Sequence, residues 1–401
     1  MASVCKRVRD ARTTFVADYF DQQGKRHNKT FLRERDAKMW LAQTQVEIKE
    51  GTHTPSTASI TVAEAGKQWL AQGERDGLER STLAGYRQHL ELHIAPYIGR
   101  VKPAELLPSH VQYLRDQLHG NGRSANMINR VVVSLGALLA CAMSYGKVAK
   151  NVVRDTARQR STRQRRLEGR HNKRLEVGVD IPRVEEINAM LRAAQGRWRP
   201  LLVTAVFTGL RASELRGLTW DGVDLENDEE LTVRQRADRW NEIGSPKSAA
   251  GKRTVPLVEM VVNALREWRL ACPKGRADLV FPNSAGNVES LLNIHRRGLG
   301  PLQYAAGITN VAMIREQQPE LSERAAAALA RRHPKYGLHS LRHFFASWAI
   351  QQGFSAKRIQ ALMGHSSIQV TFDTYGHLLP NPADDREAMR RLPAKLVGLS
   401  A

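Results

Sequence analysis

Four residues near the end of the chain carry side chains that could take part in phosphoryl transfer: His339, Arg342, His365 and Tyr375. Imidazole and guanidinium groups can bind phosphate oxygens, and a tyrosine hydroxyl can attack phosphorus. Taken alone, each residue is more often part of a solvated helix face or half-buried packing. Together, with no carboxylate cluster for a metal beside them, they predict phosphoryl transfer to tyrosine.

Two helices joined by a turn must position these four side chains. His339 and Arg342 are three residues apart and therefore share one face of a helix. Apolar residues can bury the rest of that helix: Leu341, Phe344, Phe345, Trp348 and Ile350. A second apolar helix ends at Gly364, a natural helix stop, and His365 follows it directly.

A further arginine lies upstream of these helices, in the segment 200–220. This segment predicts a buried helix through Phe207, a stop at Gly209 and a new helix beyond it. Arg211 would then lie at the junction between the two helices. Glu214, three residues further on, could reach back and brace it.

A lysine is expected near the same site. Segments 231–236 and 252–258 have the composition of strands, and Lys247 lies near the tip of the hairpin between them. From there a long cationic side chain could swing into a cleft. Lys252 and Arg253 are close by and are alternatives to Lys247, because sequence alone does not fix the register of a hairpin.

The formal net charge of the 401 residues is +21, which favours a polyanionic partner and nucleic acid above all. An anionic membrane surface is the competing partner. However, no long basic amphipathic helix stands out, and no apolar run reaches the roughly 18 residues that span a bilayer. The length suggests two to three domains.

The cysteines Cys5, Cys141 and Cys272 are scattered singly along the chain. This pattern argues against a disulfide framework and a C-x-x-C metal site, and it indicates reduced thiols. The first residues lack the apolar core of a signal peptide. We therefore expect a cytoplasmic protein without a membrane partner.

Composition divides the first part of the chain into two regions. Residues 1–55 alternate apolar and polar residues and then take helical spacing, which predicts a small sheet packed on one helix. Such a sheet could read a DNA groove, and a generic α+β cap fits the pattern as well. Residues 60–153 are mainly helical. Their expected helices are 60–72, 83–94, 108–118 and 124–146.

Arginines in two regions are candidates for contacts with DNA phosphates. The helical region supplies Arg80, Arg87, Arg123 and Arg130. A linker, 154–176, follows, and residues 154–174 hold nine Arg or Lys against two acids. Its candidates are Arg163, Arg165, Arg166 and Arg170. Laid along a duplex, these charges would release counterions; a merely solvated linker is the alternative.

With Arg211, Lys247, His339, Arg342, His365 and Tyr375 in this order, the chain resembles the tyrosine recombinases, specifically the phage-type integrases. Five strings between residues 207 and 377 carry the resemblance: TGLRASELRGL, PKSAAGKRTVPL, LQYAAGI, HSLRHFFASW and LMGHSSIQVTFDTYGH. The implied fold, which resembles type IB topoisomerases in its catalytic part, is multidomain. It has a small α+β N-terminal module, an all-α core-binding domain and a mixed, mainly α catalytic domain with a small antiparallel sheet.

The resemblance assigns these parts to residue ranges. Residues 1–55 would be an arm-type DNA-binding module, 60–153 the core-binding domain, 154–176 a basic linker and 177–385 the catalytic domain. Residues 386–401 would form a tail for subunit contact, with an intramolecular docking helix as the alternative. Residues 311–337 are an insertion, longer than the family leads us to expect, with a helical, Ala-rich centre.

The resemblance also implies the chemistry. Tyr375 would attack a scissile phosphate, form a 3′-phosphotyrosine and release a 5′-hydroxyl. Arg211 and Arg342 would hold the non-bridging oxygens. Glu214 would brace the arginine and the histidine from behind. Because phosphoryl transfer needs mainly charge stabilisation, no metal, cofactor or ATP would be required.

Proton transfer falls to the remaining residues of the implied site. Lys247 would be the general acid that protonates the departing 5′ oxygen. His339 and His365 would donate hydrogen bonds to the phosphate and assist proton transfer.

The function implied is that of a site-specific DNA recombinase that integrates or excises a phage or genomic island. It would act on double-stranded DNA attachment sites as a homotetramer, and accessory DNA-bending or directionality factors could join it. Two alternatives stay open: a type IB topoisomerase-like enzyme that nicks and reseals one duplex, and a DNA-binding regulator with an inactive site. The arm-like module and the tail favour recombination, because relaxation needs neither a second class of site nor subunit exchange.

Overall fold

The computed structural model describes residues 2–9, 12–21, 24–49, 60–148, 150–159 and 174–378. The chain divides into two compact units, residues 1–171 and 172–401. The linker arginines Arg163, Arg165, Arg166 and Arg170 and the tail 386–401 lie outside the described residues. The finer division into an arm module, a core-binding domain and a linker stays a prediction.

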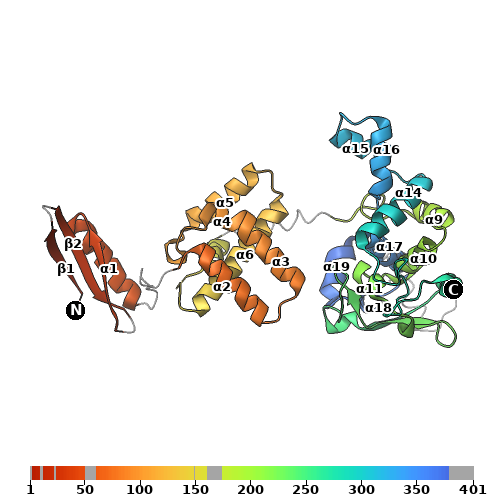
Figure 1. Cartoon of the computed structure of the whole chain (residues 1–401), viewed down its shortest axis with the longest axis horizontal. Coiled ribbons are helices and arrows are strands. Elements are labelled where there is room, and N and C mark those ends of the chain that lie inside the picture. The colour runs from red at the N-terminus through yellow and green to blue at the C-terminus, as the bar shows by residue number, and fades with distance from the viewer. Residues whose placement is uncertain are drawn as a thin grey trace, which may run out of the picture. The chain divides into compact units, whose positions relative to one another are not determined.

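The first unit begins with an antiparallel sheet and one helix (Figure 1). Its elements are β1 (Ser3–Arg9), β2 (Arg12–Phe20), β3 (Arg26–Phe31) and α1 (Glu34–Lys49). Alternation along β2 places Ala17 and Tyr19 on the same face, where they are buried with Leu41 of α1. The expected small sheet and its helix are confirmed.

The rest of the first unit is helical, as expected. Its elements are α2 (Val62–Arg75), α3 (Arg80–His89), a π-helical segment (Leu90–Ile94), α4 (Ala95–Ile98), a 3-10 turn (Pro103–Glu105), α5 (Pro108–Gly120), α6 (Ala125–Ser144) and α7 (Val152–Gln159). A reciprocal capping box between Thr61 and Glu64 begins α2. The buried face of α6 repeats at helical spacing through Val131, Leu135 and Leu138.

Helix α6 is also, within the described ranges, the one helix that is long and apolar enough to cross a membrane. Half of that apolar stretch is buried inside the structure. Its buried residues belong to the core that α6 shares with α2 and α5. This burial is typical of the central helix of a helical domain.

The second unit begins with helices and small antiparallel sheets. Its first elements are α9 (Val184–Ala193), α10 (Trp198–Thr208), α11 (Ala212–Gly217), a 3-10 turn (Trp220–Gly222), β4 (Val223–Asp224), β5 (Glu230–Val233), β6 (Arg236–Ala237), β7 (Ile243–Gly244), a 3-10 turn (Ala249–Gly251), β8 (Arg253–Pro256) and α12 (Glu259–Ala271). One sheet has the order β4-β5-β8, and β6 pairs with β7. The predicted strands therefore pair as β5 and β8, with Leu231 opposite Val255.

Helices make up the rest of the second unit. They are α13 (Leu291–Asn293), a π-helical segment (Ile294–Leu299), α14 (Gly300–Ala305), α15 (Val311–Gln317), α16 (Glu323–Arg332), α17 (Leu338–Gln351), α18 (Ala356–Met363), α19 (Ile368–Tyr375) and a 3-10 turn (Gly376–Leu378). The predicted insertion contains α15 and α16, which lie side by side (Figure 1) and share a small core of Ile314, Ala326 and Ala330.

Helix α10 is the centre of the second unit, and it packs against α12 and α17. It ends at Gly209, whose φ of +61° belongs to the left-handed region. A Cβ on Gly209 would meet the ring of Phe345 at 2.4 Å. The expectation that Trp348 helps to bury α17 is wrong: the residue is 37% exposed, and its ring stacks on Phe344 along the helix surface.

Candidate active site

Arg211 occupies the junction between α10 and α11. It is the N-cap of α11, and its backbone N–H donates to Oε2 of Glu214 at 2.8 Å. Its guanidinium donates from Nη1 to Oε1 of Glu214 at 2.7 Å and from Nη2 to the carbonyl of Gly364 at 2.8 Å. The side chain keeps 37% exposure. The start of α11 thus fixes the arginine while leaving part of it open to a ligand.

Glu214 is buried and holds a second arginine, Arg253, at the start of β8. Nη2 and Nη1 of Arg253 donate to the two carboxylate oxygens at 2.9 and 3.2 Å, and Nε donates to the carbonyl of Leu362 at 2.6 Å. Burial raises the pKa of Glu214, but the hydrogen bonds and charges of Arg253 and Arg211 outweigh it, so the net shift is downward. The carboxylate is therefore ionised.

Arg342 lies on α17 and is almost fully buried. Its Nη1 donates to the carbonyl of Gly209 at 2.5 Å, and its Nη2 donates to that of Met363 at 2.6 Å. Burial, followed by the neighbouring charge of Arg211, lowers the pKa of Arg342 to about 9. The guanidinium still carries its charge at neutral pH. These bonds connect the end of α10 to the end of α18.

Tyr375, the last residue of α19, is 2% exposed. Its hydroxyl lies 2.7 Å from Nδ1 of His343. Its ring lies nearly parallel to that of His365, at 11° and a centroid distance of 6.4 Å. Burial raises the pKa of Tyr375 well above its ordinary value, and the charges of Arg342 and Arg211 offset only part of that shift. The phenol is therefore neutral at neutral pH.

The two histidines beside the phenol are also neutral. Burial is the largest cause, and the charge of Arg342 adds to it, so that the pKa of His343 and that of His365 fall to about 4. Nδ1 of His365 lies 2.8 Å from Oγ1 of Thr371, one turn before Tyr375 on α19. This contact holds His365 against the helix that carries the phenol.

His339 lies in the first turn of α17 and keeps an exposed edge. Its ring meets that of His343 edge to face, at a centroid distance of 4.4 Å. Partial desolvation of the ring, followed by the charges of Arg342 and Arg211, lowers the pKa of His339.

Lys247 is exposed in the segment between β7 and the 3-10 turn Ala249–Gly251. The segment runs directly into Arg253, which belongs to the cluster through Glu214. The structure thus brings together Glu214 and five of the six predicted catalytic residues: Arg211, His339, Arg342, His365 and Tyr375.

The sequence analysis does not predict two members of the cluster. In it, Arg253 is only an alternative to Lys247, and His343 is absent. A signal for His343 exists, because it lies four residues after His339 and so shares its helix face. Over the described ranges, no group of three or more His, Cys, Asp or Glu side chains is placed to hold a metal ion.

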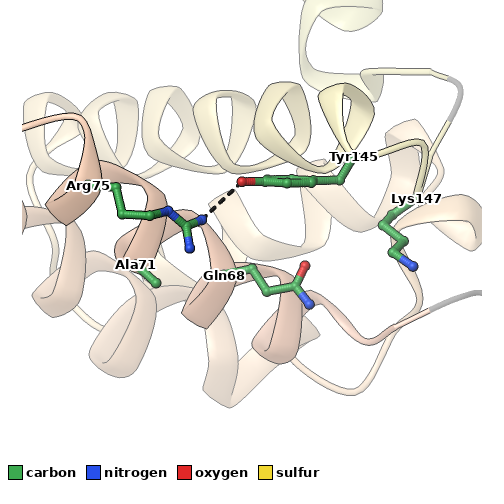
Figure 2. A pocket seen from close by; sticks show the side chains of 5 residues that line it. All are labelled: Gln68, Ala71, Arg75, Tyr145 and Lys147. Atoms are coloured by element: carbon green, nitrogen blue, oxygen red, sulfur yellow. Dashed lines mark hydrogen bonds between the residues drawn. The ribbon is translucent and has the colours of Figure 1, made fainter.

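The predicted DNA contacts of the helical region are all exposed: Arg80, Arg87, Arg123 and Arg130. Arg87 is paired with Glu74 at 3.2 Å. The same region contains a pocket with a volume of about 490 Å³. Figure 2 shows the side chains that line it: Gln68, Ala71, Arg75, Tyr145 and Lys147. Arg75 donates to the hydroxyl of Tyr145 at 3.0 Å, so a cation and a phenol share one wall of the pocket.

The chain is similar to known proteins in both sequence and fold. Residues 182–381 match the phage integrase family. A tyrosine recombinase XerC-like protein of Caldanaerobacter subterraneus subsp. tengcongensis is 24% identical over 335 residues, which cover 80% of each chain. A structure of the Tn1549 transposon integrase in complex with transposon right end DNA is similar with a TM-score of 0.62 and 20% identity, over 84% of this chain and all of that one.

A second solved structure supports the same fold. A lambda integrase tetramer bound to a Holliday junction is similar to this chain with a TM-score of 0.53 and 17% identity, over 90% of this chain and 95% of that one. The expected fold class is confirmed: a multidomain, mostly helical architecture with small antiparallel sheets.

Proposed function

Because the chain belongs to the phage integrase family of tyrosine recombinases and is a site-specific DNA recombinase, we propose that it cuts and rejoins DNA through a 3′-phosphotyrosine on Tyr375. The attacking phenol replaces the 5′ oxygen on the scissile phosphorus, and the phosphodiester energy is kept in the tyrosyl linkage. A 5′-hydroxyl of a partner strand then reverses the step. Strands are exchanged without ATP and without a free end.

One observation carries this proposal: three consecutive residues join both arginines to the phenol. Arg342 donates to the carbonyl of Met363 and Arg211 to that of Gly364, and the ring of His365 stacks on Tyr375. Gly364 permits this turn, because its φ of +63° lies in the left-handed region. The nucleophile and two phosphate-binding groups therefore meet on one short segment.

The charge of the cluster suits a phosphate in its transition state. Arg211, Arg253 and Arg342 face a single carboxylate, Glu214, so positive charge is in excess before DNA arrives. In phosphoryl transfer, charge spreads over the equatorial oxygens and needs fixed donors. Losing one such donor costs a factor of about 10²–10³ in rate. We assign this role to Arg211 and Arg342, and we assign Arg253 to holding Glu214.

The remaining chemical roles belong to two histidines and one lysine. His339 and His365 assist at the phosphate oxygens, and Lys247 protonates the departing 5′ oxygen. The exposed position of Lys247, in the segment that runs into Arg253, supports this role, since bound DNA could meet it there.

The first unit and the rest of the chain serve DNA recognition and assembly. Residues 60–153 bind attachment-site DNA through Arg80, Arg87, Arg123 and Arg130. The pocket of Figure 2 adds two cations, Arg75 and Lys147.

Residues 1–55 bind arm-type sites. The enzyme acts as a homotetramer in the bacterial cytoplasm, on phage or genomic-island DNA, and accessory DNA-bending or directionality factors set the direction. The lambda integrase tetramer on a Holliday junction supports this assembly.

Covalent capture on nicked DNA tests the chemistry. The full chain is incubated, without added metal, with a library of nicked duplexes. Cleavage close to the nick releases a short fragment with a 5′-hydroxyl, and because this fragment diffuses away, the strand cannot be rejoined. We expect a protein–DNA adduct that survives denaturation and disappears in Tyr375→Phe. Tyr304→Phe is the matched control, because Tyr304 belongs to the same unit and packs against Arg331 instead. An adduct of normal yield in Tyr375→Phe would contradict the proposal.

A further inference from the structure

The hydroxyl of Tyr375 has one described side-chain partner in hydrogen-bond contact, and that partner is His343. The distance from Nδ1 to Oη is 2.7 Å, and the rings meet edge to face at a centroid distance of 5.6 Å. The ring of His343 also meets that of His339 edge to face, at a centroid distance of 4.4 Å. Tyr375 is buried while His339 keeps an exposed edge. The three side chains form a row from the nucleophile to the protein surface.

We propose that His343 is a catalytic residue that accepts the hydroxyl proton of Tyr375 as the phenol attacks, and that it returns this proton when the phenolate leaves. The inference rests on the proposed function and adds a residue to it. In cleavage, the Oη–P bond forms, the P–O5′ bond breaks, and the Oη–H proton moves to Nδ1 of His343. The 5′ oxygen takes its proton from a separate acid, proposed above to be Lys247. Religation runs each transfer in reverse.

The phenol cannot supply its own anion at neutral pH. Its burial keeps the hydroxyl protonated, since the pKa of Tyr375 is raised. A proton acceptor must therefore touch the hydroxyl during attack, and general bases of this kind contribute about 10²–10⁴-fold. His343 meets that geometric condition without any rearrangement.

The surroundings keep His343 neutral and therefore able to accept a proton. Burial and the neighbours His339 and Arg342 lower the pKa of the imidazole to about 4, against the opposing charge of Asp180. A scissile phosphate bound at Arg342 would add negative charge beside this cluster. Negative charge favours the protonated imidazole, so the basicity of His343 rises when DNA is in place.

His365 is the other histidine in contact with the phenol ring, but it is arranged differently. Its Nδ1 is already paired with Oγ1 of Thr371, and its ring lies almost parallel to the phenol. That arrangement suits packing and a contact with phosphate. His343 instead points a ring nitrogen at the reacting oxygen.

The test compares the unchanged protein with His343→Ala and His343→Asn. The measured quantity is the rate at which each protein forms the covalent adduct on the nicked duplex. We expect both variants to be slower by about 10²-fold or more, because neither side chain takes a proton at neutral pH. Added imidazole should accelerate His343→Ala in a concentration-dependent way. His295→Ala is the matched control: it removes another half-buried histidine of the same unit, and its rate should be normal and indifferent to imidazole.

A duplex with a 5′-bridging sulfur separates the two proton transfers. Sulfur leaves as a thiolate and needs no proton, so Lys247→Ala should regain speed on this DNA while His343→Ala should not.

Three results would overturn the inference: a normal rate for either His343 variant, failure of imidazole to accelerate His343→Ala, or recovery of that variant on the sulfur-bridged DNA. Each leaves the proposed function intact as long as Tyr375→Phe forms no adduct. An adduct in Tyr375→Phe would remove the proposed function itself.

Discussion

Glu214 holds Arg253 through both carboxylate oxygens, with Nη2 2.9 Å from Oε2 and Nη1 3.2 Å from Oε1. The two side chains are 3% and 6% exposed, so water does not screen the pair. Arg211 shares the same carboxylate. Glu214 therefore neutralises part of a buried positive cluster and fixes the arginine proposed to bind phosphate.

Glu214→Gln should destabilise the protein and slow the reaction. The amide keeps the shape of the side chain but leaves Arg253 buried without its counter-charge, which typically costs about 3–5 kcal/mol. The free energy of unfolding, measured by urea denaturation, should fall by that amount. Asp221→Asn is the control, since its pair with Arg234 is exposed and such pairs contribute about 0–1 kcal/mol. Equal effects of the two changes would contradict a buried role for Glu214.

Gly209→Ala should disturb the site from a distance. The residue has a φ of +61°, and the new Cβ would lie 2.4 Å from the ring of Phe345. The carbonyl of Gly209 also accepts from Arg342, so the change should lower both stability and adduct yield. Gly353→Ala is the control: its φ is +77° but nothing lies within 4 Å of the added Cβ. Backbone strain alone costs about 1–2 kcal/mol, and Gly209→Ala should exceed the control. A smaller loss for Gly209→Ala than for Gly353→Ala would speak against this packing.

Stability should fall as the pH is lowered from 6.5 toward 4. His343 and His365 have an ordinary pKa of 6.5 that drops to about 4 in the folded protein. Between pH 6.5 and 4 these two histidines therefore bind protons in the unfolded chain but stay neutral in the folded chain. Protonation then favours unfolding. Above 6.5 both states are neutral and this contribution is constant. Urea midpoints recorded across this range should show the fall, and a smaller one in His343→Asn. An equally steep fall in that variant would show that His343 does not contribute.

The helical region should contribute to DNA affinity through charge. Arg123 and Arg130 are exposed, and replacing either with Gln should weaken binding to all duplex sequences alike. If each contacts one phosphate, the slope of log affinity against log salt should fall by about 1 per residue. Anisotropy titrations of the full chain at several salt concentrations give this slope. Arg234→Gln, which removes a cation already paired with Asp221, should leave it unchanged. An unchanged slope in both helical variants would remove these two arginines from the DNA contact.

Much of the site could be predicted because it depends on local signals. The glycine stop at Gly209 and the spacing of Arg211 and Glu214 were enough to predict a braced arginine at a helix junction, and the contacts at 2.7 and 2.8 Å agree. The stop at Gly364 likewise separates α18 from α19. Such signals act within a few residues, so one sequence contains them.

The contacts that were missed join residues far apart in the chain. Arg253 meets Glu214 across 39 sequence positions and the carbonyl of Leu362 across 109. The hydrophobic periodicity of the sequence does not indicate such a pairing, because the pairing depends on how β8 packs beside α18. The exposure of Trp348 has the same origin, since helical spacing does not reveal how wide a face the neighbouring helices cover. The comparisons favour recombination over its two alternatives, because residues 182–381 match the phage integrase family and the XerC-like relative is named a tyrosine recombinase.

The proposed mechanism requires that the phenol of Tyr375 becomes covalently attached to DNA. The most direct measurement is mass spectrometry of the captured adduct after digestion of both protein and DNA. We expect a nucleotide 3′-phosphate on the peptide that contains Tyr375, bonded to the phenol oxygen. A nucleotide attached to any other residue of the chain, or through a 5′-phosphate, would contradict it.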